Sequence, residues 1–218
     1  MSKVLREGIS LTGAGRTDTG VNARVMYAHF DTQKKIENPD AFVRSLNHLC
    51  GRAIAIHELI RVADDAHARF DAVSRTYRYF ISFDKCPFLR YFSWLSPVNL
   101  DVDAMNEAAD LLRVTDDFTS FAKLHSDAAT NICKVTEAEW KRWDNQYGVP
   151  GIMFTITADR FLRNMVRAVV GTLVEVGRGK LTPDGFRSVI EDKNRCSAGT
   201  SMPAEALFLW DISYPYIH

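Results

Sequence analysis

The order of helix-like and strand-like segments constrains the fold of this 218-residue chain more than any other feature. Apolar residues at helical spacing or helix-start signals mark the segments 39–50, 101–113, 161–176 and one that begins at Thr182-Pro183. Strand-like segments lie at 9–12, 53–59, 76–83, 134–143, 152–157 and 206–214. Helices and strands do not alternate one by one, as they would in a parallel α/β protein. The order therefore predicts an α+β fold with a largely antiparallel sheet.

Turn and cap residues refine this prediction. Asn38-Pro39 and Thr182-Pro183 each place proline at the first position of a helix, and threonine is a favoured cap. A short polar turn, 144–148, joins the strand-like segments 134–143 and 152–157, so these two segments are predicted to form an antiparallel hairpin.

Several classes of protein are disfavoured by what the sequence lacks. It has no run of 18 apolar residues, and its first ten residues contain no apolar signal core, so we expect a cytoplasmic protein. The four cysteines form no CxxC pair and have no histidine at ligand spacing: Cys50, Cys86, Cys133 and Cys196. A zinc site or a disulfide framework is therefore not expected, and free thiols are.

The net charge is zero, with 27 basic and 27 acidic residues, which by itself argues against nucleic-acid binding. The charges are unevenly distributed, however. Residues 1–100 carry 14 basic and 10 acidic side chains, whereas residues 101–150 carry 5 and 10. A neutral chain of this kind can still present a basic cleft.

A glycine-rich loop, GRTDTGV at residues 15–21, follows the first strand-like segment. Its glycines let the backbone turn sharply and let a substrate approach closely. A carboxylate at Asp18, next to the guanidinium of Arg16, is favoured in its charged form. That suits a nucleophile or an electrostatic stabiliser. The same residues are also typical of an ordinary turn in which the aspartate bonds its own backbone, so the loop alone leaves both interpretations open.

Arginines and aromatic residues are interleaved in RFDAVSRTYRYF, residues 69–80. On a strand, Tyr77 and Tyr79 share one face, and Arg78 and Phe80 share the other. Arginine contacts phosphate and tyrosine stacks on unpaired bases, so this pattern favours RNA binding. A half-buried edge strand with solvated arginines would give the same pattern.

Three arginines lie in the predicted helix 161–176 or just before it. Arg160, Arg163 and Arg167 are spaced to share one helical face, and the chain has no acidic residue between Asp159 and Glu175 to pair with them. They indicate either an anion-binding face or the charged outer face of an ordinary amphipathic helix.

Together these segments resemble the TruA family of tRNA pseudouridine synthases, in order and in approximate spacing. GRTDTGV is similar to the family's GRTDxGV loop, SRTYRY to its RxYRY strand, and NMVR to its MVR helix start. Further similar stretches lie at 117–121, 170–173, 176–177 and 204–209. The resemblance extends over essentially the whole chain.

The resemblance implies the role of each motif. Asp18 corresponds to the family's catalytic aspartate, Tyr77 to the tyrosine that contacts the target base, and Arg167 to the arginine that pairs with the aspartate. We expect all three to be catalytic, with Tyr77 stacking on the base and helping to remove the C5 proton. We expect further substrate contacts, beside Tyr77, from Arg16, Thr17, Arg75, Arg78 and Arg163. The implied reaction is isomerisation of uridine to pseudouridine in the anticodon stem-loop of tRNA. It needs no cofactor or metal, and the family's enzymes are homodimers.

The resemblance also implies a pseudouridine synthase fold of two ferredoxin- or RRM-like halves, with a mixed, largely antiparallel sheet flanked by helices. We expect an N-terminal domain, 1–98, that carries the aspartate loop and a C-terminal domain, 99–218, that carries the arginine helix. Two departures stand out. Asn22 replaces the family's histidine, and we expect it to keep a hydrogen-bonding role. The family's first strand and most of its first helix have no counterpart here, and Val4-Leu5 resembles the end of that helix.

Two other functions use parts of the same pattern. A non-catalytic RNA-binding module would use the arginines and tyrosines without needing Asp18. A hydrolase with an aspartate nucleophile would need a histidine or a second carboxylate nearby, and GRTD, RTYRY and NMVR contain neither. Within the synthase interpretation, attack by Asp18 at C6 of uracil and at C1′ of ribose are both open.

Overall fold

The computed structural model describes residues 1–123 and 129–217, which fold into two compact units. The first unit comprises Met1–Gly15, Tyr27–Asp71 and the C-terminal residues from Pro215. The second comprises Arg16–Met26 and Ala72–Tyr214.

This division differs from the expected domains 1–98 and 99–218. The reason is the position of β4 (Ser74–Ser82), which is hydrogen-bonded to β7 (Gly151–Ala158) on one side and to β8 (Leu207–Ser213) on the other. Because β4 lies between two strands from the C-terminal part of the chain, residues 72–98 pack with that part.

The first unit is built from small elements. Its helices are α1 (Ser2–Leu5) and α2 (Pro39–Leu49), and β1 (Thr12–Gly13) pairs antiparallel with β3 (Ala28–His29). Leu5, Phe42 and Leu46 form its buried core. The predicted start of α2 is confirmed, because the Asn38 side chain accepts a hydrogen bond from the backbone N–H of Ala41 at 2.9 Å.

Two strand predictions in this unit are wrong. Of the segment 9–12, only Thr12 belongs to a strand, and the segment 53–59 forms no strand. The backbone N–H and C=O of Ile56 bond instead to the side-chain amide of Asn47, on α2. A side chain thus supplies the hydrogen bonds that a neighbouring strand would have made.

The second unit contains a six-stranded sheet, ordered β2-β8-β4-β7-β6 with β5 also paired to β4. The strands not yet introduced are β2 (Asn22–Ala23), β5 (Trp94–Leu95) and β6 (Val135–Arg142). The pairs β2/β8 and β4/β5 are parallel and the others antiparallel, including the predicted β6/β7 hairpin. The predicted α+β class with a mixed, largely antiparallel sheet is therefore confirmed.

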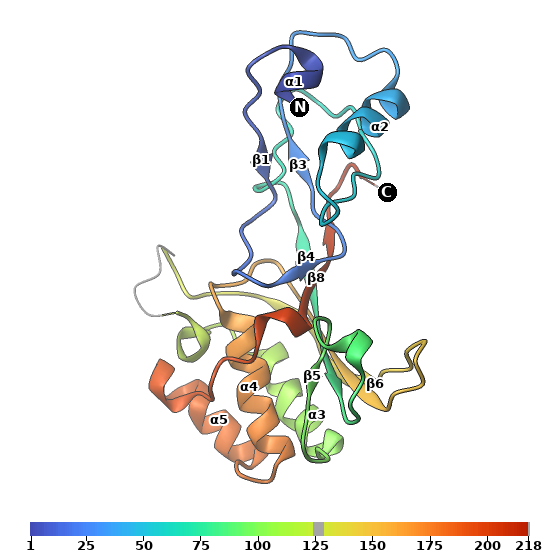
Figure 1. The fold of residues 1–218 in the computed structure, drawn as a ribbon. Helices are drawn as coiled ribbons and strands as arrows, with labels where there is room; N and C mark the ends of the chain where they lie inside the picture. The colour runs from blue at the N-terminus through green and yellow to red at the C-terminus, as the bar shows by residue number, and fades with distance from the viewer. Residues whose placement is uncertain (124–128, 218) are drawn as a thin grey trace. The chain divides into compact units, whose positions relative to one another are not determined.

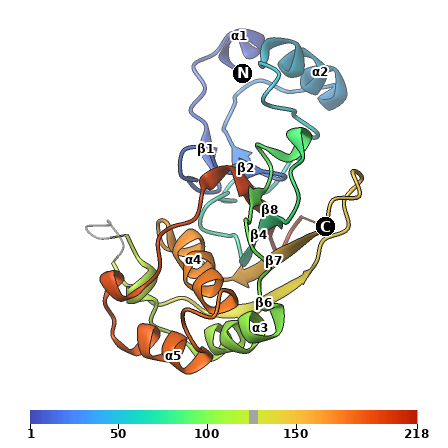
Figure 2. The same cartoon turned by 60° about the horizontal axis from the view of Figure 1, so that its bottom comes forward.

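Three helices pack together beside this sheet in Figures 1 and 2: α3 (Val102–Asp110), α4 (Met165–Gly177) and α5 (Pro183–Glu191). The short 3₁₀ turns lie at Pro87–Leu89, Leu111–Val114, Thr119–Phe121, Arg195–Ser197 and Ala204–Ala206. Asp101 and Thr182 cap α3 and α5 by accepting from backbone N–H groups, so both predicted helices are confirmed, although α3 ends three residues early.

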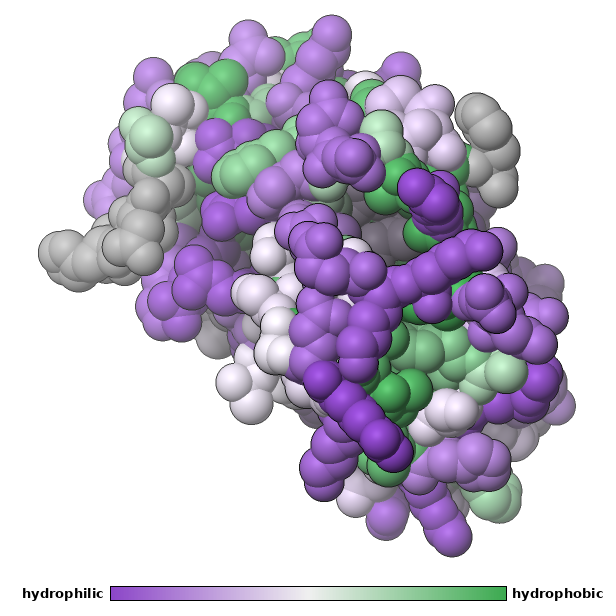
Figure 3. Space-filling view, turned by 90° about the horizontal axis from the view of Figure 1, so that it is seen from above, coloured by the Kyte–Doolittle hydropathy of each residue, from purple (hydrophilic) through white to green (hydrophobic). Residues whose placement is uncertain are grey.

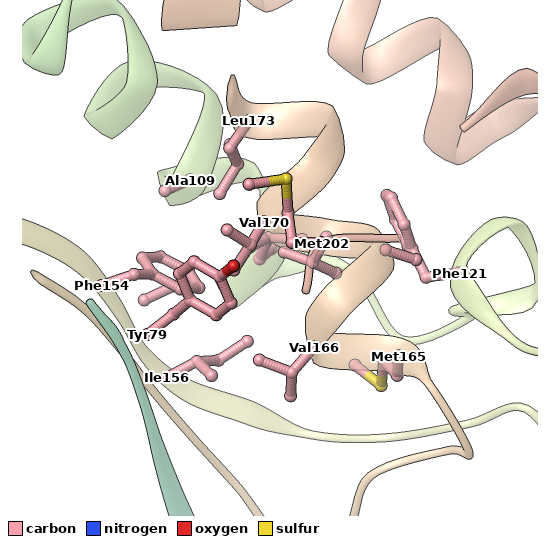
Figure 4. Close-up of a cluster of buried hydrophobic side chains, with 14 of the residues drawn as sticks. Tyr79, Ala109, Phe121, Phe154, Ile156, Met165, Val166, Val170, Leu173 and Met202 are labelled. Carbon is pink, nitrogen blue, oxygen red and sulfur yellow. The ribbon is translucent and has the colours of Figure 1, made fainter. Parts of the chain in front are cut away.

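The core of this unit forms where α4 lies against the sheet. Figure 4 shows Tyr79, Phe154 and Ile156 facing Val166 and Val170 of the helix. All residues of α4 except Arg167 and Glu175 are buried. A helix that is apolar almost all round belongs inside a protein, so its two charged residues mark places where α4 meets polar groups.

The outer surface has the opposite character. The face shown in Figure 3 is largely hydrophilic, with smaller hydrophobic patches between the polar side chains. Within residues 1–123 and 129–217, no helix combines the length and the apolar composition that crossing a membrane requires.

Candidate active site

The loop that carries Asp18 is shaped by a tight turn. The backbone N–H of Val21 donates to the C=O of Asp18 at 3.1 Å, and Gly20 lies between them with a φ of 86°. A positive φ at the third residue is what a type II turn requires, and glycine adopts it without strain. The local sequence therefore sets the turn that presents Asp18.

The far end of this loop is fixed to the sheet. Asn22 begins β2, which pairs with Phe208 and Leu209 of β8, and its side-chain amide donates to the C=O of Glu205 at 2.8 Å. The expected hydrogen-bonding role of Asn22 is thus confirmed. The bond holds the Asp18 loop next to the 3₁₀ turn before β8.

Both carboxylate oxygens of Asp18 face guanidinium groups. Oδ2 lies 3.4 Å from Nη1 of Arg167, and Oδ1 lies 3.8 Å from Nε of Arg163. The side chains of Asp18 and Arg167 are 23% and 22% exposed, whereas that of Arg163 is 63% exposed. The Arg167 pair is therefore the better shielded of the two, and the Arg163 pair is weakened by water.

Arg167 is held from a second direction. Its Nε donates to the C=O of Met202 at 2.6 Å, and its backbone C=O accepts from the N–H of Met202 at 3.1 Å. Figure 4 shows the Met202 side chain beside α4. The guanidinium is thus aimed at Asp18 by a bond to the segment that crosses the helix.

Two glycines allow that segment to come so close. A Cβ on Gly171 would lie 1.9 Å from the backbone oxygen of Thr200, and one on Gly199 would lie 3.0 Å from the backbone of Gly171. The hydroxyl of Thr172 accepts from the N–H of Gly199 at 2.9 Å. Close backbone packing therefore fixes residues 199–202 against α4, and with them the acceptor of Arg167.

The predicted helix 161–176 begins later than expected. Asn164 has a left-handed backbone, with a φ of 64°, so α4 starts at Met165. The expectation that Arg160, Arg163 and Arg167 share a helical face is therefore wrong. Only Arg167 is on the helix, and Arg163 reaches Asp18 from the turn before it.

Tyr77 lies on β4 and is half-buried. Its ring packs edge-on against Phe161, with 5.1 Å between the ring centroids. Burial raises the pKa of the Tyr77 hydroxyl to about 12; the charge of Arg75 lowers it, and that of Asp18 raises it further. Within the described residues no hydrogen bond joins Tyr77 to Asp18, so the two groups interact through charge.

The other predicted substrate contacts are placed differently. Arg16 is exposed and forms no ion pair with Asp18 in the described part of the chain, so the neighbour expected from the sequence is not the one that holds the carboxylate. Thr17 is half-buried in the same loop. Arg75 donates to the C=O of Asp159 at 3.0 Å.

Arg78 lies on the opposite face of the sheet from Tyr77, as alternation along the strand predicts. Its guanidinium stacks on the ring of Trp210 at 4.2 Å, and Arg24 approaches the same ring at 4.9 Å. Burial lowers the pKa of Arg78. The structure therefore does not bring Arg78 together with Asp18.

Asp18 opens onto a hollow of about 600 Å³. Its lining consists of Asp18, Thr19, Lys123, Arg163, Asn164, Arg167 and Arg195. Four of these side chains are cationic and one is a carboxylate, so the hollow attracts anions. Sequence reasoning missed Lys123 and Arg195, because no motif or spacing connects them to the Asp18 loop. Asn164 belongs to the NMVR motif but was not expected to line the site. We call this hollow the Asp18 pocket.

A metal centre of protein ligands is not assembled in the described residues, where no three His, Cys, Asp or Glu side chains gather in a way that would hold an ion. The four cysteines are free thiols. The side chains that line the Asp18 pocket offer a carboxylate, guanidinium groups and an ammonium group, with the phenol of Tyr77 nearby.

Comparison with known proteins identifies the family. Residues 108–215 match a family model described as tRNA pseudouridine synthase. The tRNA pseudouridine synthase A of Bacteroides fragilis is 52% identical over 215 residues, which cover 99% of this chain and 84% of that protein. The protein of the same name from Bacillus subtilis is 37% identical over 212 residues, covering 96% and 83%.

The matches include the Asp18 loop, β4 and α4, because they extend over nearly the full length of the chain. The protein of the same name from Parabacteroides distasonis is 50% identical over 212 residues, which cover 97% of this chain and 82% of that protein. This chain belongs to the tRNA pseudouridine synthase A family of isomerases.

Proposed function

We propose that this chain converts uridine to pseudouridine in the anticodon stem-loop of tRNA, with Asp18 as the nucleophile. The observation that supports this most directly is the position of Asp18, paired with Arg167 and facing a basic pocket. Membership of the family supports tRNA as the substrate. The pocket volume is within the range of about 300–1,000 Å³ that is usual for ligand sites.

A uridine in a stem has to leave the base stack before its glycosidic bond can be reached. The extruded nucleotide brings a phosphate on each side, and the cationic lining of the Asp18 pocket suits both. In this proposal Arg163 contacts the extruded nucleotide as well as Asp18. Arg16, Thr17 and Arg75 act on the RNA around it.

The reaction rearranges bonds without adding or removing atoms. A carboxylate oxygen of Asp18 bonds to C6 of uracil or to C1′ of ribose, and the N1–C1′ bond breaks. The uracil rotates, and a new bond forms between C5 and C1′. C5 loses its proton, N1 gains one, and the bond to Asp18 breaks to restore the carboxylate. Arg167 keeps that carboxylate charged and aimed throughout.

Tyr77 is proposed to cover the uracil and to position it. Removal of the C5 proton by Tyr77 would require the phenolate. With a pKa of about 12, the phenolate is only about 10⁻⁵ of the population at neutral pH. The neutral hydroxyl instead donates a hydrogen bond, and the ring supplies the stacking surface.

Two wider features belong to the same proposal. The active form is a homodimer in which one tRNA contacts both subunits, and it works in the cytoplasm, where tRNA is found. Both follow from the family resemblance and from the substrate. The first is checked by measuring the molar mass of the protein alone and with tRNA.

The test of the proposed function is removal of the carboxylate. Asp18→Asn keeps the size of the side chain, and we expect pseudouridine formation in unmodified tRNA to fall by more than about 1,000-fold, because the nucleophile is lost. Turnover is measured by tritium release from tRNA labelled at C5 of uridine. Asp110→Asn is the matched control, because Asp110 is an exposed residue of α3 that pairs with Arg113 at 3.6 Å and does not line the Asp18 pocket.

The same experiment separates the alternatives. Turnover that survives in Asp18→Asn would overturn the assignment of the nucleophile. Tight tRNA binding without turnover in either protein would favour a non-catalytic RNA-binding module. A hydrolase is disfavoured by the pocket itself, because Asp18 is the only carboxylate among the described residues that line it.

A further inference from the structure

The charges in the Asp18 pocket do not balance. Arg163 and Arg167 both pair with Asp18. Among the described residues, neither Lys123 nor Arg195 has a carboxylate within ion-pair distance. The pocket therefore presents cationic groups beyond those that its own carboxylate uses, and such groups are suited to an anion from outside.

Of these two residues, Arg195 is held in a fixed orientation. Its Nη1 donates to the C=O of Gly199 at 3.2 Å and to that of Ala198 at 3.4 Å, and its Nη2 donates to Oγ of Ser201 at 2.9 Å. A guanidinium has more N–H donors than these bonds use. Arg195 is half-exposed, so donors remain that can face the pocket.

Ser201 links Arg195 to the start of α4. The same Oγ accepts from Nδ2 of Asn164 at 2.6 Å, and Asn164 is the residue whose positive φ begins the helix. The next residue, Met202, accepts from Arg167. One short segment thus positions both Arg167, which holds Asp18, and Arg195, which lines the same pocket.

We propose that Arg195 is a positioning residue that binds a phosphate next to the target uridine. The proposal rests on the proposed function, since it needs an RNA strand in the Asp18 pocket. A rigid, planar guanidinium is the side chain best matched to two oxygens of a phosphate. Arg195 thereby fixes the backbone of the extruded nucleotide, while Asp18 and Tyr77 act on its sugar and base.

A purely structural role makes a different prediction. If Arg195 only braced the segment 198–201, its loss would lower the stability of the fold and leave the salt dependence of tRNA binding unchanged. A phosphate contact, by contrast, releases a counterion, so that its loss lowers the slope of log K against log salt concentration. The two roles are therefore separated by the salt dependence.

The first experiment compares Arg195→Gln with wild type and with Arg187→Gln, which removes an exposed arginine of α5 that is outside the pocket. tRNA affinity is measured at several salt concentrations, and thermal stability alongside. We expect Arg195→Gln to bind about tenfold more weakly and its slope to fall by about 0.7–0.9. Arg187→Gln should leave the slope as in wild type.

A second experiment tests the contact directly. tRNA is assembled with an uncharged methylphosphonate in place of the phosphate on one side or the other of the target uridine. We expect one of the two substitutions to weaken binding to wild type about tenfold and to have little further effect on Arg195→Gln, because the same contact is already lost. Arg195→Lys should keep part of the sensitivity, since it retains the charge but not the fork.

The outcomes are distinct. An unchanged salt slope in Arg195→Gln, with the same sensitivity as wild type to each methylphosphonate, would overturn the proposal even if the variant melts at a lower temperature. If wild type forms no pseudouridine but the slope and the methylphosphonate coupling behave as expected, the proposed function fails and the phosphate contact of Arg195 stands. If turnover is normal but neither effect appears, the phosphate contact of Arg195 fails and the proposed function stands.

Discussion

Tyr77 and Arg78 are neighbours in β4, yet their side chains belong to opposite faces of the sheet. Tyr77 is on the face that packs against the helices, where Tyr79 meets α4. Arg78 is on the other face, stacked on Trp210. The motif RTYRY therefore contributes to two different environments.

The difference between Arg167 and Arg78 shows what makes an arginine available for chemistry. Arg167 is held by a carboxylate and a backbone carbonyl, so its positive charge is fixed next to Asp18. Arg78 is held by an aromatic ring, and its buried Nε has no hydrogen-bond partner in the described residues. A guanidinium stacked in this way covers apolar surface as much as it supplies charge.

Within this comparison, the largest expected effect concerns Arg167. Arg167→Lys retains the charge, but it replaces the two nitrogens that reach the C=O of Met202 and the carboxylate of Asp18 with a single nitrogen. We expect turnover at saturating tRNA to fall by about 100-fold, or about 3 kcal/mol, because Asp18 loses its orientation. Tritium release is measured, with urea unfolding to verify the fold. Full activity in this variant would show that only charge matters at this position.

A smaller effect is expected from Tyr77 at high pH. Its pKa is raised by burial from 10 to about 12, so the native state holds the proton more tightly than the unfolded state. The resulting stabilisation is complete below about pH 10 and is lost as the pH rises to about 12. Urea unfolding at pH 9 and pH 11.5 should therefore show that wild type loses about 2 kcal/mol more than Tyr77→Phe.

The same variant tests the role of Tyr77 in the reaction. If the hydroxyl only donates a hydrogen bond, Tyr77→Phe should lose about tenfold in turnover, with the same pH profile as wild type between pH 6 and pH 9. A wild-type rate that climbs with pH over this range, and a flat rate in Tyr77→Phe, would instead show that the phenolate is the base.

The smallest effect is expected on the other face. Arg78→Met removes the stacking on Trp210, and it also removes the buried Nε that lacks a partner, so the free energy of unfolding should change by less than about 1 kcal/mol. Turnover should stay within about threefold of wild type. A clear loss of tRNA affinity would show that RNA also reaches this face, as expected for Arg78 from the sequence.

Several predictions that depended on neighbouring residues were confirmed. The helices predicted at 39–50, at 101–113 and from Thr182 begin where expected, because Asn38, Asp101 and Thr182 each accept a hydrogen bond within the first turn. The β6/β7 hairpin joins strands that are adjacent in the sequence. The prediction for the segment 53–59 was wrong because its backbone found a partner in a side chain of α2, and the start of α4 was misplaced because Asn164 adopts a left-handed backbone.

The sequence by itself determined three things. It set the turn that presents Asp18, it set the alternation that separates Tyr77 from Arg78, and its motifs indicated the family. Only the tertiary structure decided which of them meet. Asp18 and Arg167 are 149 residues apart in the chain. Arg195 lines the same pocket, although no sequence motif indicated it. Such contacts arise from close packing between α4 and the segment 199–202, which depends on many distant residues at once.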